Sequence, residues 1–358
     1  MYLNKLQMYE KQISSADPTY FIADIAANHD GELSRAVELI YLAAEAGADC
    51  AKFQHFTADT IVSKKGFSGD LAAVSHQSEW SDSVYDVYDA YHTKKEWDDA
   101  LVRTCKDAGI HFMTTPYNFD AIERFRNAVP GFKIGSGDIT FAQMIDKVAQ
   151  TGLPLFLATG AANFDDVDQA LKIANKYNNQ ICLMQCNTNY TGSLENFKYV
   201  NLNVLKTFKI AYPDIVLGLS DHTPGHSAVL GAVALGARVI EKHFTDDNLR
   251  VGPDHSFALN PTTWKEMVDA TRELQLALGD GYKRVEENEL ETVIIQRRCL
   301  RATTNLKAGH VITMKDLVAL RPAPSGSISP MEIDDLVGST LTLDIEEGDY
   351  LSWENTRQ

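Results

Sequence analysis

Two histidines and a glutamate occupy positions at which a protein could bind a divalent metal ion. Glu241 and His243 are two residues apart in an apolar segment, 238–243, that is typical of a β-strand. Because alternate side chains of a strand share a face, both point the same way. A second histidine, His222, follows an earlier apolar segment. Neutral imidazoles beside a carboxylate suit a divalent cation, so this pattern predicts a metal centre. A hydrogen-bonded core histidine is the alternative at each position.

Two lysines indicate a binding site for an anion. Lys133 is followed by Ile134-Gly135-Ser136-Gly137, in which the glycines expose backbone N–H groups and the serine adds a hydroxyl. Lys52 and Thr115 come after two other apolar segments. The motif predicts a phosphate cradle, with a plain tight turn as the alternative. A phosphate side and a metal side together suit an enzyme that joins a phosphorylated three-carbon unit to a metal-polarised carbonyl.

Eight short β-like segments alternate with amphipathic helical segments over most of the chain. This alternation predicts a TIM (β/α)8 barrel, with a doubly wound α/β sheet as the competing fold. The predicted strands are 20–25, 49–54, 111–115, 132–135, 154–159, 180–186, 215–220 and 238–243. The predicted helices are 33–46, 95–108, 119–128, 141–151, 165–176, 202–212, 223–235 and 264–278.

Active sites in TIM barrels lie at the carboxyl ends of the strands. All eight predicted strands end in polar groups, so we expect a lined pocket there. These groups are Asp24, Lys52, Gln54, Thr115, Lys133, Ser136, Thr159, Gln185, Asn187, His222, Glu241 and His243. The long insert 57–91 is expected to be a lid or substrate wall at this mouth, or else a covering flap or a dimer contact.

The predicted domains are a catalytic barrel over 1–282, a charged linker over 283–292, and a small mostly-β domain over 293–358. In this last part the helical alternation stops, and short β-like segments separated by glycines take its place. Because the last domain is small, we expect it to be stabilised by docking against a barrel, either its own or a partner's.

Composition narrows the class of protein. The chain has 358 residues with 44% hydrophobic and 23% charged residues, which is typical of a soluble globular protein. Its net charge of -16 argues against a nucleic-acid partner. The five scattered cysteines fit reduced thiols, so a cytoplasmic location is expected. No apolar run approaches the roughly 20 residues needed to span a membrane, so no membrane association is expected.

The motifs together resemble those of the sialic acid synthase (N-acetylneuraminate synthase) family over nearly the whole length. The final domain resembles that family's SAF (antifreeze-like) domain, on Ile312-Thr313 and Leu320-Arg321-Pro322. The barrel motifs that carry the resemblance are 22–31, Lys52-Phe53-Gln54, Thr115-Pro116-Tyr117, 132–137, Ala158-Thr159-Gly160, 218–223, 241–245 and Gly252-Pro253-Asp254.

The resemblance implies that phosphoenolpyruvate is condensed with an N-acetylated amino sugar, such as N-acetylmannosamine, to give a nonulosonic (sialic-type) acid. It implies that His222 and His243 bind Mn²⁺ or Mg²⁺, and that Asp24 and Glu241 are catalytic with them. It implies a domain-swapped homodimer, in which Arg321 reaches the partner's barrel and recognises the sugar's acyl group. The other substrate-binding residues that it implies are Lys52, Gln54, Thr115, Lys133, Ser136, Thr159, Thr188, Tyr190, Ser220 and Asp254.

Several residues depart from the family pattern. Asp24 stands for the usual glutamate, Ala158 for a serine and Thr188 for an asparagine, while Gln185-Cys186-Asn187 replaces His-Cys-Thr. These changes suggest a related sugar of the legionaminic, pseudaminic or spore-coat type, with neutral drift as the alternative. Two other functions stay open: a 3-deoxy sugar-acid synthase that uses a phosphorylated aldose, and a catalytically weak carbohydrate-binding homologue.

Overall fold

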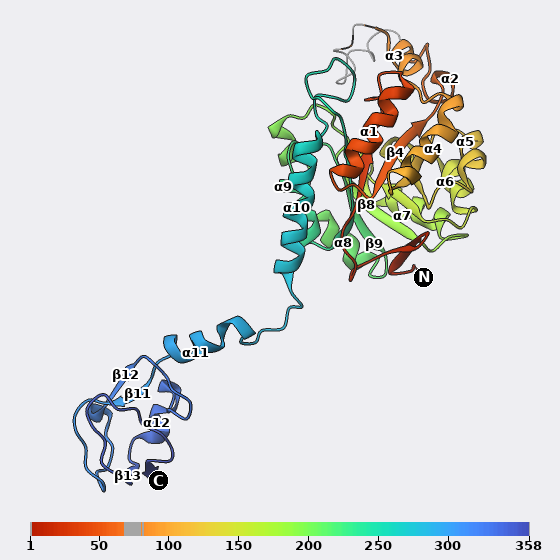
Figure 1. The fold of residues 1–358 in the computed structure, drawn as a ribbon. Helices are drawn as coiled ribbons and strands as arrows, with labels where there is room; N and C mark the ends of the chain where they lie inside the picture. Colours follow the sequence, from red (N-terminus) through yellow and green to blue (C-terminus); the bar gives the residue numbers. More distant parts are fainter. Residues whose placement is uncertain (1, 68–79, 81, 358) are drawn as a thin grey trace. The chain divides into compact units, whose positions relative to one another are not determined.

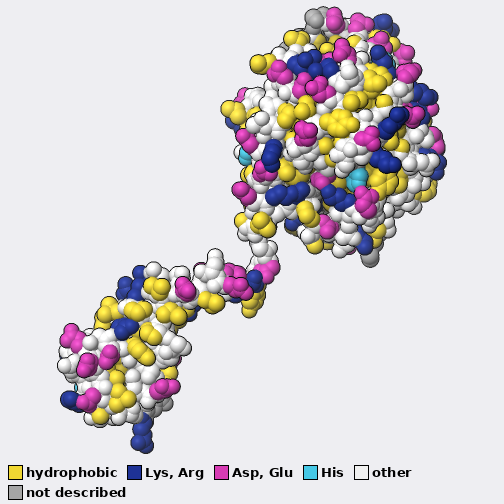
Figure 2. Space-filling view, in the orientation of Figure 1, with side chains coloured by type: hydrophobic (Ala, Val, Ile, Leu, Met, Phe, Trp, Pro, Cys, Tyr) yellow, Lys and Arg dark blue, Asp and Glu magenta, His cyan; other side chains and the backbone are white. Residues whose placement is uncertain are grey.

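The structure is a computed structural model that describes residues 2–67, 80 and 82–357. Contacts divide the chain into two compact units, Met1–Gly279 and Asp280–Gln358, each of which is described by itself. The division lies close to residue 282, the predicted end of the barrel domain. Lysines and arginines are interspersed with aspartates and glutamates over the visible face of each unit, so both charge signs share these surfaces (Figure 2).

Eight parallel strands close into a barrel in the first unit, which confirms the predicted TIM barrel (Figure 1). Each strand pairs with its neighbours in the chain, and the last strand pairs with the first. The doubly wound alternative is therefore wrong, because an open sheet leaves two edge strands unpaired. The strands are β3 (Tyr20–Asp24), β4 (Cys50–His55), β5 (His111–Pro116), β6 (Phe132–Ile134), β7 (Leu155–Ala158), β8 (Ile181–Cys186), β9 (Val216–Asp221) and β10 (Ala237–His243).

Helices pack around the outside of this barrel and bury their apolar faces against it (Figure 1). Capping hydrogen bonds and backbone angles at single residues set the ends of these helices. The last one, for example, begins where the Asn260 side chain accepts a hydrogen bond from the Thr263 N–H, and it ends at Gly279, where φ is 59°. The helices are α1 (Leu33–Glu45), α4 (Asp98–Asp107), α5 (Phe119–Phe125), α6 (Ala142–Ala149), α7 (Phe164–Ala174), α8 (Val204–Ala211), α9 (Ser227–Ala234) and α10 (Pro261–Leu278), with a 3₁₀ turn (Lys95–Trp97) before α4.

The register of β9, β10 and β3 brings together the residues singled out above. Glu241 is paired with Ser220, and His243 is paired with Asp24. Lys242 is paired with Asp221. Because neighbouring residues of a strand point to opposite faces, Lys242 and Asp221 lie on the face away from Glu241 and His243.

An N-terminal hairpin, which the sequence analysis did not predict, adds to the barrel's inner core. It consists of β1 (Lys5–Met8) and β2 (Lys11–Ser14). Leu6, Met8 and Ile13 are fully buried, and they cluster with inward side chains of the barrel strands. The alternation of Leu6 and Met8 with polar neighbours was the available signal. The hairpin and the insert helices described next lie toward opposite ends of the barrel in Figure 1.

The predicted insert contains two helices, α2 (Ala58–Ile61) and α3 (Val84–Tyr91). Residues 68–79 and 81 of this segment lie outside the described residues. The hydroxyl of Tyr85 on α3 donates a hydrogen bond to Asp59 on α2 at 2.6 Å, so a side-chain hydrogen bond links the two helices.

The second unit has a small β core of its own. Its strands are β11 (Cys299–Ala302), β12 (Leu317–Leu320), β13 (Thr340–Leu341) and β14 (Thr356–Arg357), with a short helix α12 (Ile333–Leu336). Leu300, Leu336 and Leu351 lie in its buried apolar cluster. The predicted linker overlaps a helix, α11 (Leu290–Gln296), that the sequence analysis did not expect.

Candidate active site

A cavity of about 370 Å³ collects side chains from the carboxyl ends of the barrel strands and from the insert. It brings together groups from positions far apart in the sequence, as the strand-end pattern predicts. The expected site residues that line it are Asp24, Lys52, Gln54, Thr115, Lys133, Ser136, Thr188, Tyr190, Ser220, His222, Glu241, His243 and Asp254.

Two buried lysines and two buried carboxylates form the centre of the cavity. The ammonium of Lys52 lies 2.7 Å from Asp24 Oδ2 and 3.9 Å from Glu241 Oε1. The Lys133 ammonium lies 2.9 Å from the same Glu241 oxygen. Burial alone would raise the pKa of Asp24, but Lys52 and His243 beside it hold that pKa below its usual value. Asp24 is therefore held as a carboxylate beside the Lys52 ammonium in a desolvated environment, where their interaction is stronger than in water.

A cradle of small residues lies beside Lys133. The Ser136 hydroxyl oxygen accepts a hydrogen bond from the Gly160 N–H at 3.0 Å. A Cβ atom at Gly160 would lie 1.8 Å from Thr188 Oγ1 and 2.8 Å from Ser136 Oγ. Only glycine fits this point, so the backbone can approach the two hydroxyl groups closely. Hydroxyls and a glycine backbone next to an ammonium suit a phosphate or carboxylate group.

The two predicted metal-binding histidines lie side by side. Their ring centroids are 5.4 Å apart, and Tyr190 packs on His222 with ring centroids 4.3 Å apart. Burial lowers the pKa of His243 to about 3, so this imidazole is neutral at pH 7. Burial also lowers the pKa of His222, but bonds to Cys186 and the Asn187 carbonyl outweigh it and leave that pKa above its usual value. A cation at His222 would thus compete with a proton.

Unpaired buried atoms around these histidines fit a divalent cation. His243 Nδ1 and Glu241 Oε2 have no hydrogen-bond partner in the part of the chain that the structure describes, and Asp254 Oδ2 lies 3.7 Å from His243 Nδ1. Within residues 2–67, 80 and 82–357, no three His, Cys, Asp or Glu side chains gather closely enough to make a complete protein ligand set. Two imidazoles would leave coordination positions open to substrate and water, as in catalytic metal sites.

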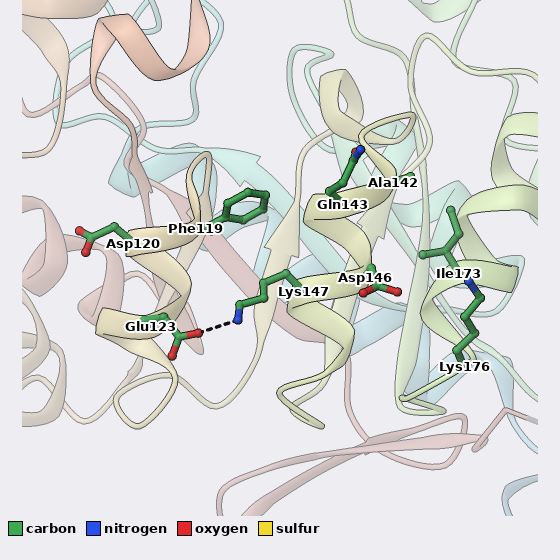
Figure 3. A pocket seen from close by; sticks show the side chains of 9 residues that line it. All are labelled: Phe119, Asp120, Glu123, Ala142, Gln143, Asp146, Lys147, Ile173 and Lys176. Atoms are coloured by element: carbon green, nitrogen blue, oxygen red, sulfur yellow. Dashed lines mark ion pairs between the residues drawn. The ribbon is translucent and has the colours of Figure 1, made fainter.

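A larger hollow, of about 780 Å³, lies on the outer surface along α5, α6 and α7 (Figure 3). Phe119, Ala142 and Ile173 contribute its apolar part, and Glu123 forms an ion pair with Lys147 at 3.0 Å. These are side chains of the helices, and none of the site residues predicted from the sequence lines it. The smaller cavity at the strand ends is therefore the candidate active site.

Comparison with known proteins identifies the family. Residues 39–283 match the NeuB family, and residues 297–355 match the SAF domain. The chain belongs to the NeuB family. This confirms the resemblance to sialic acid synthases and the SAF-like ending.

The N,N'-diacetyllegionaminic acid synthase of Legionella pneumophila is 33% identical over 351 residues, which cover 96% of each chain. The human N-acetylneuraminate-9-phosphate synthase is 29% identical and covers 96% of this chain and 94% of its own. The crystal structure of a spore coat polysaccharide biosynthesis protein from Bacillus subtilis has a TM-score of 0.64, at 29% identity and 99% coverage of both chains. This NeuB-family chain is therefore an enzyme, a phosphoenolpyruvate-condensing nonulosonic acid synthase.

Two of the expected site residues of this NeuB-family protein do not line the cavity. The hydroxyl of Thr159 donates to the Met184 carbonyl oxygen at 3.0 Å within the barrel. Arg321 is an exposed residue of the second unit, directly after β12, and its contact with a partner's barrel stays a prediction.

Among the described residues, no helix combines the length and the apolar character needed to cross a bilayer.

The cavity also contains residues that the sequence analysis missed. Asp138 lines it, and burial raises the pKa of this carboxyl to about 6. Its position directly after Gly135-Ser136-Gly137 was the available signal. Tyr117 also lines the cavity, two residues beyond the predicted strand end at Thr115. Ile61 and Val87 come from the insert and Phe56 lies directly before it; such apolar residues carry no chemical signature in the sequence.

A backbone position in the left-handed region lies two residues after Asp24. Asp24 Oδ1 accepts a hydrogen bond from the Ala26 N–H at 3.1 Å, and Asp24 Oδ2 accepts one from Gln54 at 3.2 Å. Ala26 has φ of 46°, in the left-handed region that favours glycine. Ala26 stands where the family opening usually has glycine, so this chain holds the shorter carboxylate next to a strained alanine.

Proposed function

We propose that this cavity condenses phosphoenolpyruvate with an N-acetylated amino sugar to give a nonulosonic acid and phosphate. The observation that carries the proposal is that Lys52, Lys133, His222 and His243 line one cavity, in which both lysines lie beside Glu241. The lysines suit a multiply charged anion, and the histidines suit a cation that binds a carbonyl oxygen. Both functions are required when an enol phosphate attacks an aldehyde.

Each group then has a role in the proposed reaction. Lys52, Lys133, Thr115 and Ser136 bind the phosphate and carboxylate of phosphoenolpyruvate. Carbon 3 of phosphoenolpyruvate forms a bond to the sugar's aldehyde carbon, whose oxygen takes the C=O electron pair and a proton to become a hydroxyl. Water adds at carbon 2, and phosphate leaves by C–O cleavage. Glu241 Oε2, which has no hydrogen-bond partner among the described residues, would accept a proton from the attacking water, and Asp24 would keep Lys52 charged and oriented.

The other predicted residues would position the sugar. Asp254, Tyr190, Thr188, Gln54 and Ser220 supply carboxylate, hydroxyl and amide groups that suit a polyol. Thr159, whose hydroxyl donates a hydrogen bond to the Met184 carbonyl oxygen within the barrel, would support these sugar-binding residues.

His222 and His243 would hold the divalent cation, Mn²⁺ or Mg²⁺. When bound, such a cation supplies Lewis-acid polarisation of the sugar's carbonyl. The neutral imidazole of His243 and the free atoms around it are the support for this assignment.

The predicted homodimer and the role of Arg321 belong to the same proposal, as does a cytoplasmic location. Arg321→Ala should raise the KM for the sugar at least 10-fold and leave the KM for phosphoenolpyruvate unchanged, because only an acyl contact is lost. Arg297→Ala, at another exposed arginine of the second unit, is the matched control. An unchanged KM for the sugar would remove Arg321 from the site.

The direct test measures phosphate release from phosphoenolpyruvate in the presence of Mn²⁺ and a panel of amino sugars and phosphorylated aldoses. We expect release that depends on both the amino sugar and the cation, and that stops when the cation is chelated. Release with a phosphorylated aldose alone would favour the 3-deoxy sugar-acid synthase instead. The SAF domain argues against that alternative, because those enzymes are usually single barrels.

A further inference from the structure

Four rings pack together where the proposed cation ligands lie: Tyr190, His222, His243 and Phe257. The ring centroid of Phe257 lies 4.9 Å from that of His243 and 6.1 Å from that of His222, edge-on in both cases. It also lies 5.7 Å from the ring centroid of Tyr190. Phe257 is 4% exposed and is not among the described residues that line the cavity. It can therefore act on a bound group only through the rings that it contacts.

The two imidazoles are oriented by different kinds of contact. His222 Nδ1 lies 3.0 Å from the Asn187 carbonyl oxygen, which is the kind of hydrogen bond that orients most metal-binding histidines. His243 has no such bond to a described residue. Its Nδ1 lies 3.7 Å from Asp254 and its Nε2 lies 3.7 Å from Asp24, and both distances exceed that of a hydrogen bond. Because the terminal torsion of a histidine has only broad minima, packing has to orient this imidazole.

The backbone on either side of Phe257 is anchored to the barrel. The Leu259 N–H donates to the His243 carbonyl oxygen at 2.9 Å, and the Thr245 N–H donates to the Leu259 carbonyl oxygen at 3.0 Å. The imidazole of His255 is fully buried, with Nδ1 2.6 Å from the Thr245 hydroxyl. Phe257 thus lies between two anchored residues, so its ring is a fixed surface for the imidazole of His243.

Phe257 is also the nearest ring to His243 in the described part of the chain, because the centroids of His222 and Tyr190 lie 5.4 and 6.0 Å away. We infer, on the basis of the cation site proposed above, that Phe257 is a positioning residue whose ring holds the His243 imidazole in the orientation that binds the cation. Since Phe257 packs on His222 as well, it also fixes the angle between the two imidazoles. An ordinary core phenylalanine would instead stabilise the fold without affecting the affinity for the cation.

The test compares Phe257→Leu with Phe244→Leu in the full chain. Leucine keeps an apolar side chain at each position but removes the flat ring. Phe244 is the matched control because it directly follows His243 and is fully buried, while its ring packs on Trp264 of α10 at a centroid distance of 5.5 Å. Both variants lose a buried ring, so we expect comparable decreases in the midpoint of thermal unfolding.

Binding of Mn²⁺ is measured by electron paramagnetic resonance in the absence of both substrates. We expect Phe257→Leu to weaken Mn²⁺ binding about 10-fold, as the loss of an orienting partner of a metal-binding histidine typically does, and Phe244→Leu to leave it unchanged. The dissociation constant of phosphoenolpyruvate, measured by calorimetry without the cation, should be unchanged in both variants, because the proposed anion site uses Lys52 and Lys133. If Phe257→Leu does not fold, Phe257→Met replaces the ring with a flexible chain and carries the same expectation.

The outcomes separate the inference from the proposed function. Unchanged Mn²⁺ affinity in folded Phe257→Leu, or equal weakening in both leucine variants, would overturn the inference and leave the condensation standing. Absence of Mn²⁺ binding to the wild type would overturn the proposed cation site, and the inference with it. Absence of phosphate release with every sugar, together with the expected difference in Mn²⁺ affinity, would overturn the proposed function alone.

Discussion

The ammonium of Lys242 lies 2.5 Å from the Asp221 carboxylate, and both side chains are almost completely buried behind the strand ends that carry His243 and His222. Lys242 also donates to the Thr223 carbonyl oxygen at 2.6 Å, and the Thr223 hydroxyl donates to Asp221. Because Lys242 and Asp221 are directly opposite in the register of β10 and β9, their ion pair joins the backbones on which the two histidines sit.

Removing one partner of this pair should destabilise the barrel strongly. Lys242→Met leaves the Asp221 carboxylate buried without its cation, which typically costs about 3–5 kcal/mol of unfolding free energy. Urea denaturation followed by circular dichroism measures the loss. Lys265→Met removes an exposed lysine paired with Asp269, and it should cost less than about 1 kcal/mol. Equal losses of unfolding free energy in the two variants would show that the buried pair stabilises the fold no more than the exposed pair does.

His243→Ala should abolish cation-dependent phosphate release and leave the fold intact. The imidazole is buried and makes no hydrogen bond at Nδ1 to any described residue, with Asp254 Oδ2 3.7 Å away, so its loss removes the proposed cation ligand without breaking a hydrogen bond there. Turnover and Mn²⁺ affinity are the measurements, with thermal unfolding as the check on folding. His226→Ala, at a histidine that does not line the cavity, should retain activity. Full activity of His243→Ala would remove this residue from the metal site.

Asp138 should make stability depend on pH. Burial raises its pKa to about 6 from an ordinary value of 3.8, so the folded state binds this proton more tightly than the unfolded state does. The contribution of Asp138 to stability is therefore largest below pH 4 and falls as the pH rises toward 6. Asp138→Asn should be stabilised relative to the wild type more at pH 7 than at pH 4, as measured by urea midpoints. A constant difference across this range would contradict the raised pKa.

Ala26→Gly should stabilise the chain by about 1 kcal/mol, because glycine adopts the left-handed conformation without the steric cost of a Cβ atom. Ala46→Gly is the matched control: Ala46 has φ of -76°, so glycine there should be neutral or destabilising. The midpoints of thermal unfolding of the two variants test this expected stabilisation. A lower midpoint for Ala26→Gly would show that the φ of 46° is not a source of strain.

Gly160→Ala should weaken phosphoenolpyruvate binding, because its Cβ would meet Thr188 and Ser136 in the anion cradle. We expect the KM for phosphoenolpyruvate to rise by at least 10-fold. Gly231→Ala on α9 is the control: Gly231 does not line the cavity, and a Cβ atom there would meet the end of the Leu202 side chain, so this variant should keep a normal KM. If Gly160→Ala kept a normal KM, the cradle would not be the phosphoenolpyruvate site.

The sequence by itself determined the barrel and most of the cavity. Strand and helix periodicities are local properties, and parallel strands of a closed barrel place their carboxyl ends at one mouth. The types and order of the strand-end residues therefore predicted that Lys52, Lys133, His222, Glu241 and His243 would meet. The structure brings all five to one cavity.

Only the tertiary structure decided which atoms contact one another. The Lys133–Glu241 ion pair joins residues 108 positions apart, and its distance depends on the closure and register of the whole barrel. For the same reason Thr159 bonds inside the barrel, and Lys242 meets Asp221 on the outer face. Burial is likewise a property of the folded packing, which is why the raised pKa of Asp138 was absent from the sequence-based prediction. For the same reason the insert 57–91 was predicted as a lid or substrate wall without its cavity-lining residues Ile61 and Val87 being named.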